Sequence, residues 1–448
     1  MSQLSSFGKG DTHWFTHDRF GMFIHWGLYS MPARHEWVRN VEYLTDEQYQ
    51  IYFDLFNPDL FQPREWARAA REAGMKYFII TVKHHEGFCL WDTQYTDFKI
   101  TNTPFGRDAL REIVDAFRAE GLHVGFYYSL LDWHHPDFTV DECHPLRNRP
   151  DRAALNQGRN MRRYAQYMRD QVTELLTNYG KVDILWFDFS YKPKPGTPGE
   201  IWGKGHPERS SWDGKGHEDW ESEEMVKLVR SLQPNIILNN RLDLPGDGDI
   251  VTPEQYTPDA PMNDELGRPA VWEGCHTFSG SWGYFRDEMT WKSGKQCIDL
   301  LINHVSRNGN VLMNVGPTSR GYLDSRAMEC LGAYAQWMKY NSRSIYGCGA
   351  APAEFPEPRD CRYTYNPETR RLYLHLMNWP YKHVLLPKMA GRIRYAQFLH
   401  DGSEVLFREN SKEVNAALHA QCPEGDVALE LPVIQPPQIT PVIEIFLK

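Results

Sequence analysis

The sequence has no excess of positive charge. It carries 49 lysines and arginines against 59 aspartates and glutamates, a formal net charge of -10 at pH 7, and no run rich in Lys or Arg. Proteins that bind the nucleic-acid backbone usually carry a basic patch or stripe. We therefore expect no nucleic-acid partner.

Long apolar runs are also missing. No run approaches the roughly 18 residues that a membrane-spanning helix needs. The N-terminal segment MSQLSSFGKGDTHWF lacks the basic region followed by an apolar region that marks a secretion signal. These absences predict a cytoplasmic protein with no membrane partner.

Cysteine is sparse and follows no pattern. The eight cysteines include no CxxC motif, and a chain of 448 residues is too large to need disulfides to stabilise a small core. We therefore predict mostly buried thiols. Aromatic residues, in contrast, are abundant: 15 Trp, 23 Tyr and 22 Phe make up 13% of the chain.

Short apolar segments alternate with amphipathic segments from about residue 19 to residue 340, as in a parallel sheet wrapped by helices. Strands are predicted at residues 19–26, 75–82, 122–129, 182–188, 235–239, near 250, near 271 and 310–315. Helices are predicted at residues 64–73, 108–120, 160–179, 221–232, 294–305 and 324–340. This order predicts an α/β fold of the (β/α)8 barrel type. The alternative is a doubly wound open sheet, but the sequence has no GxGxxG motif after the first predicted strand.

The pattern changes near residue 350. Segments such as 371–377 and 441–447 alternate apolar and polar residues and are separated by Pro, Gly and Asn. This alternation is typical of a small antiparallel β-sandwich. We therefore predict a (β/α)8-like TIM barrel domain over residues 1–345 and a C-terminal β-sandwich domain over residues 346–448.

Polar and aromatic side chains collect where the predicted barrel strands end. From the first strand to the sixth they are His25, His84, His85, Tyr127, Asp188, Arg241 and Glu254. The C-terminal ends of barrel strands are where active sites of this fold lie. Two carboxylates in different surroundings, Asp188 after a hydrophobic strand and Glu254 in a loop, can supply a nucleophile and a general acid.

Several segments resemble those of a known family in the same order. They are FGMFIHWGLYSMP with HEW, KHHEGFCLWDT, GFYYSLLDWHHP, DILWFD, LNNR, WEGCHTFSGSWGY and NGNVLMNVGP. Across residues 14–345 the sequence resembles the α-L-fucosidase family of retaining glycoside hydrolases, glycoside hydrolase family 29. The resemblance implies a catalytic barrel, a C-terminal β-sandwich, no cofactor or metal, and a fucosylated oligosaccharide or glycoconjugate as substrate. The oligomeric state stays open, with a homo-oligomer as one option.

The resemblance also implies roles for single residues. Asp188 matches the family nucleophile and Glu254 the general acid/base, with Glu273 as the alternative acid/base. The matches to substrate-binding positions are His25, Glu36, Trp37, His84, His85, Tyr127, Trp186, Arg241 and Trp282. Fucose presents three hydroxyls and one methyl group, so polar groups and aromatic rings are both needed in its pocket.

Two positions depart from the family pattern. Glu86 stands where the KHHxGF motif more usually has Asp, and Phe189 with Ser190 follows Asp188 where Gly is usual. Both departures bear on the leaving group rather than on the reaction. Residues 192–217, rich in Gly, Pro and Lys, form a long loop that is a candidate for shaping the leaving-group site.

Two other functions remain open. A metal-dependent barrel hydrolase would use His25, His84, His85 and Asp188 as ligands. Adjacent histidines at a strand end point to different sides, however, and no HxH lies on the first strand. The second alternative is a lectin-like module that binds fucose without catalysis, for which one of the two carboxylates would be unnecessary.

Overall fold

Parallel strands in the described part of the chain form one sheet around a common axis. The computed structural model describes residues 8–191, 194–195, 211–212, 214–246, 248–409 and 422–448. The order of strands across the sheet is β7, β4, β3, β2, β1, β10, β9, β8. Along the chain they are β1 (Phe20–Ile24), β2 (Tyr77–Lys83), β3 (His123–Ser129), β4 (Ile184–Asp188), β7 (Ile237–Leu238), β8 (Ile250–Val251), β9 (Val271–Thr277) and β10 (Gly309–Val315).

The two edge strands, β7 and β8, meet at a short seam. Asn239, directly after β7, forms a parallel bridge with Ile250. The carboxylate of Asp249 accepts hydrogen bonds from the Leu238 amide at 2.7 Å and from the Arg230 Nη2 at 2.6 Å. The sheet therefore closes, and the predicted (β/α)8-like barrel is confirmed.

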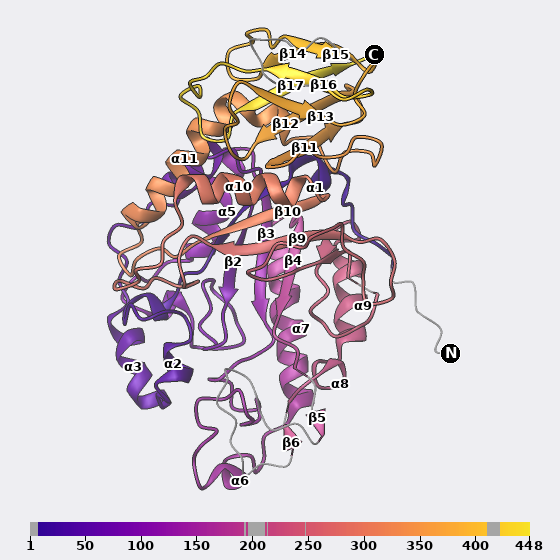
Figure 1. Ribbon diagram of the computed structural model, residues 1–448. Coiled ribbons are helices and arrows are strands. Elements are labelled where there is room, and N and C mark those ends of the chain that lie inside the picture. The colour runs from indigo at the N-terminus through magenta and orange to yellow at the C-terminus, as the bar shows by residue number, and fades with distance from the viewer. Residues whose placement is uncertain (1–7, 192–193, 196–210, 213, 247, 410–421) are drawn as a thin grey trace.

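Helices between the barrel strands lie around the outside of the sheet, whereas the short helix at residues 152–155 lies well below it in the view (Figure 1). The helices described are α1 (His13–Asp18), α2 (Val38–Val41), α3 (Asp46–Leu55), α4 (Pro63–Glu72), α5 (Ala109–Ala119), α6 (Arg152–Leu155), α7 (Met161–Asn178), α8 (His217–Trp220), α9 (Ser222–Leu232), α10 (Gly294–Val305) and α11 (Ser325–Asn341), with short 3-10 turns η1 (Leu28–Ser30), η2 (Ile100–Asn102) and η3 (Ser342–Ser344). The predicted helices correspond to α4, α5, α7, α9, α10 and α11. Between β7 and β9 the described residues contain no helix. None of the helices described has the length and apolar character of a membrane span.

Local sequence signals explain where the helices begin and end. The Asp108 side chain accepts the Arg111 amide at 2.9 Å and so caps α5, and Ser293 forms a capping box with Gln296 at the start of α10. After α5, Gly121 has a φ of +77°, the left-handed conformation that glycine adopts most easily at a helix end. These caps set the helix lengths and therefore the places where the strands emerge.

Strand alternation sends side chains to two separate cores. In β4, Trp186 packs inside the barrel, whereas Phe187 packs toward the helices. By the same alternation, Asp188, two residues after Trp186 and at the end of the strand, points toward the inside. The core inside the barrel contains Phe15, Phe23, Tyr77, Ile79, Tyr127, Ile184, Trp186, Ile237, Ile250, Cys275 and Leu312.

The C-terminal part consists of two antiparallel sheets that share one apolar core. One sheet has the order β11 (Cys361–Asn366), β12 (Arg371–Leu376), β17 (Val442–Leu447), β14 (Ile393–Phe398), and the other β13 (His383–Leu386), β16 (Val427–Glu430), β15 (Phe407–Glu409). A separate two-stranded ribbon, β5 (Lys194–Pro195) with β6 (Ser211–Trp212), follows β4. The boundary at residues 345 and 346 stays a prediction.

The C-terminal sheets join the barrel at the N-terminal ends of its strands. Arg19, which directly precedes β1, donates its Nε–H to the Cys348 carbonyl at 2.8 Å, and Figure 1 shows these sheets beyond α10 and α11. The opposite, C-terminal ends of the strands lie far from this junction. All eight cysteines are buried free thiols, as predicted.

The seam between β7 and β8 leads to a stability prediction. Replacing Asp249 by Ala leaves the buried Arg230 guanidinium and the Leu238 amide without their carboxylate partner. Breaking such a buried pair costs about 3 kcal/mol of unfolding free energy, which urea denaturation followed by circular dichroism measures. The control is Asp59→Ala, which removes an exposed ion pair with Arg320. An Asp249→Ala protein that is as stable as this control would contradict the prediction.

Candidate active site

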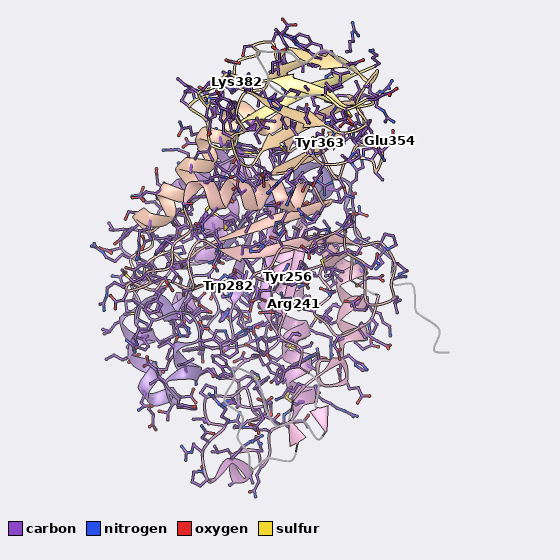
Figure 2. All side chains as sticks on the ribbon, viewed as in Figure 1. Arg241, Tyr256, Trp282, Glu354, Tyr363 and Lys382 are labelled. Atoms are coloured by element: carbon purple, nitrogen blue, oxygen red, sulfur yellow. The ribbon has the colours of Figure 1, made fainter. Side chains whose placement is uncertain are left out.

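One arginine joins two carboxylates at the C-terminal ends of the barrel strands. The Arg241 Nη1 lies 2.7 Å from Asp188 Oδ1, at the end of β4, and its Nη2 lies 3.0 Å from Glu254 Oε2, beyond β8. Glu254 is held beside β9 by a parallel bridge to Cys275. Two acids from different strands therefore share one guanidinium. Figure 2 shows Arg241 and Trp282 on the barrel, apart from Tyr363 in the C-terminal sheets.

Further contacts fix the orientation of the Arg241 guanidinium. Its Nε–H donates to Thr252 Oγ1 at 3.0 Å, and its Nη2 also donates to the Thr252 carbonyl at 3.1 Å. Its Cζ lies 4.3 Å from the centre of the Trp186 ring, a cation–π contact. Burial alone would lower the pKa of Arg241, but the neighbouring anions, Asp188 first among them, raise it above its usual value. Arg241 therefore stays positively charged.

Asp188 accepts a second hydrogen bond on its other oxygen. The Tyr127 hydroxyl donates to Asp188 Oδ2 at 2.7 Å. Burial and the charge of Asp188 both raise the pKa of Tyr127, so this hydroxyl keeps its proton and remains a donor. The Asp188 carboxylate is thus buried between a cation and a phenol, which compensates for its removal from water.

Glu254 has a different environment. Its side chain lies at the rim of the barrel, with 43% of its surface exposed. Partial removal from water raises the pKa of Glu254. The Arg241 cation lowers it and the nearby Asp188 charge raises it, and the net result is a pKa above the usual value. The two carboxylates therefore differ: Asp188 is buried and doubly hydrogen-bonded, whereas Glu254 lies at the rim with a raised pKa.

Two buried histidines present unprotonated nitrogens. The Ser129 hydroxyl donates to the Leu131 carbonyl, so it accepts from His85 Nδ1 at 2.7 Å, and His85 Nε2 then carries a lone pair. That Nε2 lies 3.9 Å from Asp188 Oδ2. Burial and the neighbouring His84 lower the pKa of His85 well below its usual value. His85 is therefore a neutral hydrogen-bond acceptor beside Asp188.

His25 is oriented in the same way. The Asn314 side chain donates its Nδ2 to the Trp282 carbonyl at 2.6 Å, which leaves Asn314 Oδ1 to accept from His25 Nδ1 at 2.7 Å. Burial lowers the pKa of His25 well below its usual value, with a smaller effect from His84. The His25 Nε2 is therefore a second acceptor, and Asn314 places His25 and Trp282 together.

The remaining predicted residues line the same region. The Glu36 Oε2 accepts the Gly283 amide at 2.7 Å, which ties Glu36 to the loop that carries Trp282. The Trp37 ring lies 4.9 Å from the His85 ring, and the His84 ring is stacked on the Tyr127 ring at 5.6 Å. The structure thus brings together all the predicted residues: His25, Glu36, Trp37, His84, His85, Tyr127, Trp186, Asp188, Arg241, Glu254 and Trp282.

The alternative acid, Glu273, lies elsewhere. It is fully buried inside the barrel and accepts a hydrogen bond from the hydroxyl of Tyr77, the first residue of β2, at 2.5 Å. Burial raises the pKa of Glu273 to about 8. Because Tyr77 starts its strand, Glu273 lies toward the N-terminal end of the barrel, on the side away from the mouth. The Glu273 carboxylate thus accepts a hydrogen bond from a tyrosine, whereas the Glu254 carboxylate pairs with Arg241.

Glu86 lies behind the site, in contact with His84. Its Oε2 is 3.5 Å from His84 Nδ1, and both side chains are buried. Ser129, Asn314 and Thr252, which orient other site residues, were not predicted. Asn314 and Ser129 lie at or next to the ends of their strands, so the rule that identified His25 and Asp188 could have found them. Thr252 follows β8 directly but carries no other signal.

Left-handed backbone conformations lie directly beside Glu36, Asp188 and Glu254. His35 precedes Glu36 with a φ of 68°, Phe189 follows Asp188 with a φ of 80°, and Gln255 follows Glu254 with a φ of 60°. Such conformations are costly for residues other than glycine, and they cluster at functional sites. Within the described residues, no group of three or more His, Cys, Asp or Glu side chains has the arrangement of a metal site.

Comparison with known proteins places the chain in a family. A model of the alpha-L-fucosidase family matches residues 5–343. Plasma alpha-L-fucosidase of Homo sapiens is 29% identical over 392 residues, which cover 82% of this chain and 76% of that protein.

Solved structures agree along the whole chain. Alpha-L-fucosidase isoenzyme 1 from Paenibacillus thiaminolyticus is 42% identical, with a TM-score of 0.85 over 98% of both chains. A GH29 alpha-L-fucosidase from Bacteroides thetaiotaomicron, solved as a trapped covalent intermediate, is 25% identical, with a TM-score of 0.80 over 100% of both chains. The barrel, its mouth and these relatives together show that this chain belongs to the alpha-L-fucosidase family of glycoside hydrolases, GH29.

Proposed function

We propose that this chain is a retaining exo-α-L-fucosidase that removes terminal α-L-fucosyl residues from glycans by double displacement. The observation that carries the proposal is the sharing of the Arg241 guanidinium by Asp188 and Glu254. Two carboxylates on one guanidinium are close together. Paired carboxylates at this kind of spacing are the catalytic groups of glycoside hydrolases, and the trapped covalent intermediate of the Bacteroides relative favours the retaining course over the inverting one.

In the first step, Asp188 attacks the anomeric carbon while Glu254 gives its proton to the departing oxygen. The ionised Asp188 is the nucleophile because Arg241 and Tyr127 stabilise its negative charge. Glu254 is the acid because its pKa is raised. In the second step, Glu254 takes a proton from a water molecule, whose oxygen bonds to the anomeric carbon as the bond to Asp188 breaks, and fucose is released. The trapped covalent intermediate of the Bacteroides relative supports this two-step course.

Sugar recognition follows from the lining of the site. The free Nε2 atoms of His25 and His85 would accept hydrogen bonds from two fucose hydroxyls, and Glu36 would accept a third. Trp186 and Trp282 would pack against the ring and the methyl group of the 6-deoxy sugar. No bound metal or cofactor is part of this proposal. A chelator that abolishes activity, with zinc restoring it, would favour a metal-dependent hydrolase instead.

The identity of the nucleophile can be tested by chemical rescue. We expect Asp188→Gly to fold but to lose nearly all hydrolysis of 4-nitrophenyl α-L-fucoside, because no group remains to attack the anomeric carbon. Added azide should restore turnover by entering the space left by the carboxylate. It would then give β-L-fucosyl azide, with inverted configuration, as detected by NMR. Wild-type turnover by the variant without azide would exclude Asp188 as the nucleophile.

Removing the acid/base gives the opposite product. For Glu254→Ala we expect about 100-fold slower hydrolysis of a fucosylated disaccharide, whose leaving group needs a proton, but a much smaller loss on fucosyl fluoride. Azide should attack the intermediate from the Glu254 side and give α-L-fucosyl azide. Glu273→Gln is the matched control, and its hydrolysis of both substrates should stay near the wild-type level. Loss of the disaccharide reaction in this control alone would transfer the role to Glu273.

The pH profile provides an independent test. A general acid must be protonated, and the raised pKa of Glu254 preserves its proton to higher pH than in a free glutamic acid. Activity should therefore fall as the pH rises through this pKa. In Glu254→Gln, which cannot titrate, this fall in kcat/KM on the disaccharide should disappear from the residual activity. An unchanged basic limb would assign it to another group.

A further inference from the structure

Phe189 has an unusual position for a large side chain. It follows Asp188 directly, is partly buried, and has a left-handed backbone with a φ of 80°. This conformation is an outlier for an aromatic residue and persists only where the surroundings enforce it. A glycine would adopt it without strain. The position therefore keeps a ring where the backbone favours none.

Contacts on the C-terminal side hold this conformation. The Ser190 hydroxyl donates to the Arg241 carbonyl at 2.9 Å and accepts from the indole Nε1–H of the buried Trp220 at 2.9 Å. Tyr191 and Lys215 exchange backbone hydrogen bonds of 2.8 and 2.7 Å. Asp188, on the N-terminal side, is fixed by β4. The chain on both sides of Phe189 is thus anchored, so the ring cannot turn away by relaxing the backbone.

The ring packs against residues of the proposed fucose site. It lies 5.2 Å from the Trp37 ring, 5.2 Å from the His85 ring and 5.4 Å from the Tyr191 ring, measured between centres. The Phe189 ring also lies at the margin of the apolar cluster that contains Phe187. Its contacts with Trp37 and His85, next to Asp188, place it at the mouth of the barrel.

Depth separates this ring from those that would hold fucose. Trp186 and Tyr127 are 2% and 1% exposed, inside the barrel, whereas Phe189 lies one residue beyond the strand end and retains exposed surface. A terminal sugar held by an exo-acting enzyme occupies the deepest part of its site, so the rest of the glycan leaves through the mouth. A partly exposed ring at that level faces the next sugar.

We propose that Phe189 is a specificity-determining residue that supplies an apolar wall for the sugar next to fucose, stacking on its C–H face. This inference rests on the proposed fucosidase activity. Aromatic rings at sugar sites bind the apolar faces of pyranoses and exclude water from the adjoining bond. Tyr191, whose ring centre lies 5.4 Å from that of Phe189, would extend the same wall.

Three substrates with different leaving groups test the inference: fucosyl fluoride, 4-nitrophenyl α-L-fucoside and a fucosylated disaccharide. Fluoride is a single atom and cannot contact the wall. For Phe189→Gly we expect the loss of kcat/KM on the disaccharide to exceed the loss on fucosyl fluoride by about tenfold. Phe189→Leu, which keeps apolar volume without a flat ring, should give an intermediate loss. Phe105→Ala, a partly buried ring beside Arg107, is the control, and all three of its reactions should match the wild type.

Each outcome decides the question. Equal losses on the three substrates, with weaker inhibition by free fucose, would show that Phe189 acts on the fucose site through Trp37 and His85, and would overturn the inference. No loss on the disaccharide would overturn it as well. A wild-type protein that leaves fucosyl fluoride unhydrolysed would instead contradict the proposed function. Phe189→Gly should fold, because glycine removes the backbone strain, and thermal denaturation checks this directly.

Discussion

The contact of Arg241 with both carboxylates is the interaction on which the rest of the site depends. Two nearby anions at a partly buried barrel mouth repel each other, and without a cation between them one would be forced to take up a proton. A guanidinium suits this place because it keeps its charge and offers several donors in one plane. Thr252 and Trp186 fix the plane of the Arg241 guanidinium, and the guanidinium in turn positions the two acids. The acids are thus positioned by residues that would not touch the reacting bond.

The difference between the two acids comes from their second partners. Asp188 accepts from Tyr127 on the oxygen that Arg241 does not bind, so both of its oxygens are satisfied. Glu254 shares only the far side of the guanidinium and lies at the rim. The two carboxylates therefore stand in different surroundings, and burial raises the pKa of Glu254 above its usual value.

Much of this architecture could be predicted from the sequence because periodicity and position report on it directly. The alternation of apolar segments located the barrel strands, and the strand-end rule located Asp188, Arg241 and His25. The closure at Asn239 and Ile250 could not be predicted, because strands of two residues carry almost no pattern.

Some features depend on three-dimensional neighbours alone. The sequence leaves the choice between Glu254 and Glu273 open because both follow or lie within predicted strands. Only the structure shows that Glu254 lies at the mouth of the barrel and Glu273 toward its opposite end. The left-handed backbone of Phe189 opposes the local preference of its residue type, so no propensity argument would have found it. The tautomers of His25 and His85 follow from Asn314 and Ser129, whose partners are remote in sequence.

The short seam of the barrel also sets the order in which the molecule should come apart. Arg241 follows β7 and Glu254 follows β8, and each of these strands has only two residues. Asp188, in contrast, ends a five-residue strand that is paired along its length with β3. Regions with few backbone hydrogen bonds open first, at a free-energy cost far below that of global unfolding. On mild heating, amide exchange should therefore rise around residues 237–251 before it rises in β2 and β3. Arg241, which lies between these two strands in sequence, would then be displaced while Asp188 is still in place, and inactivation would precede denaturation.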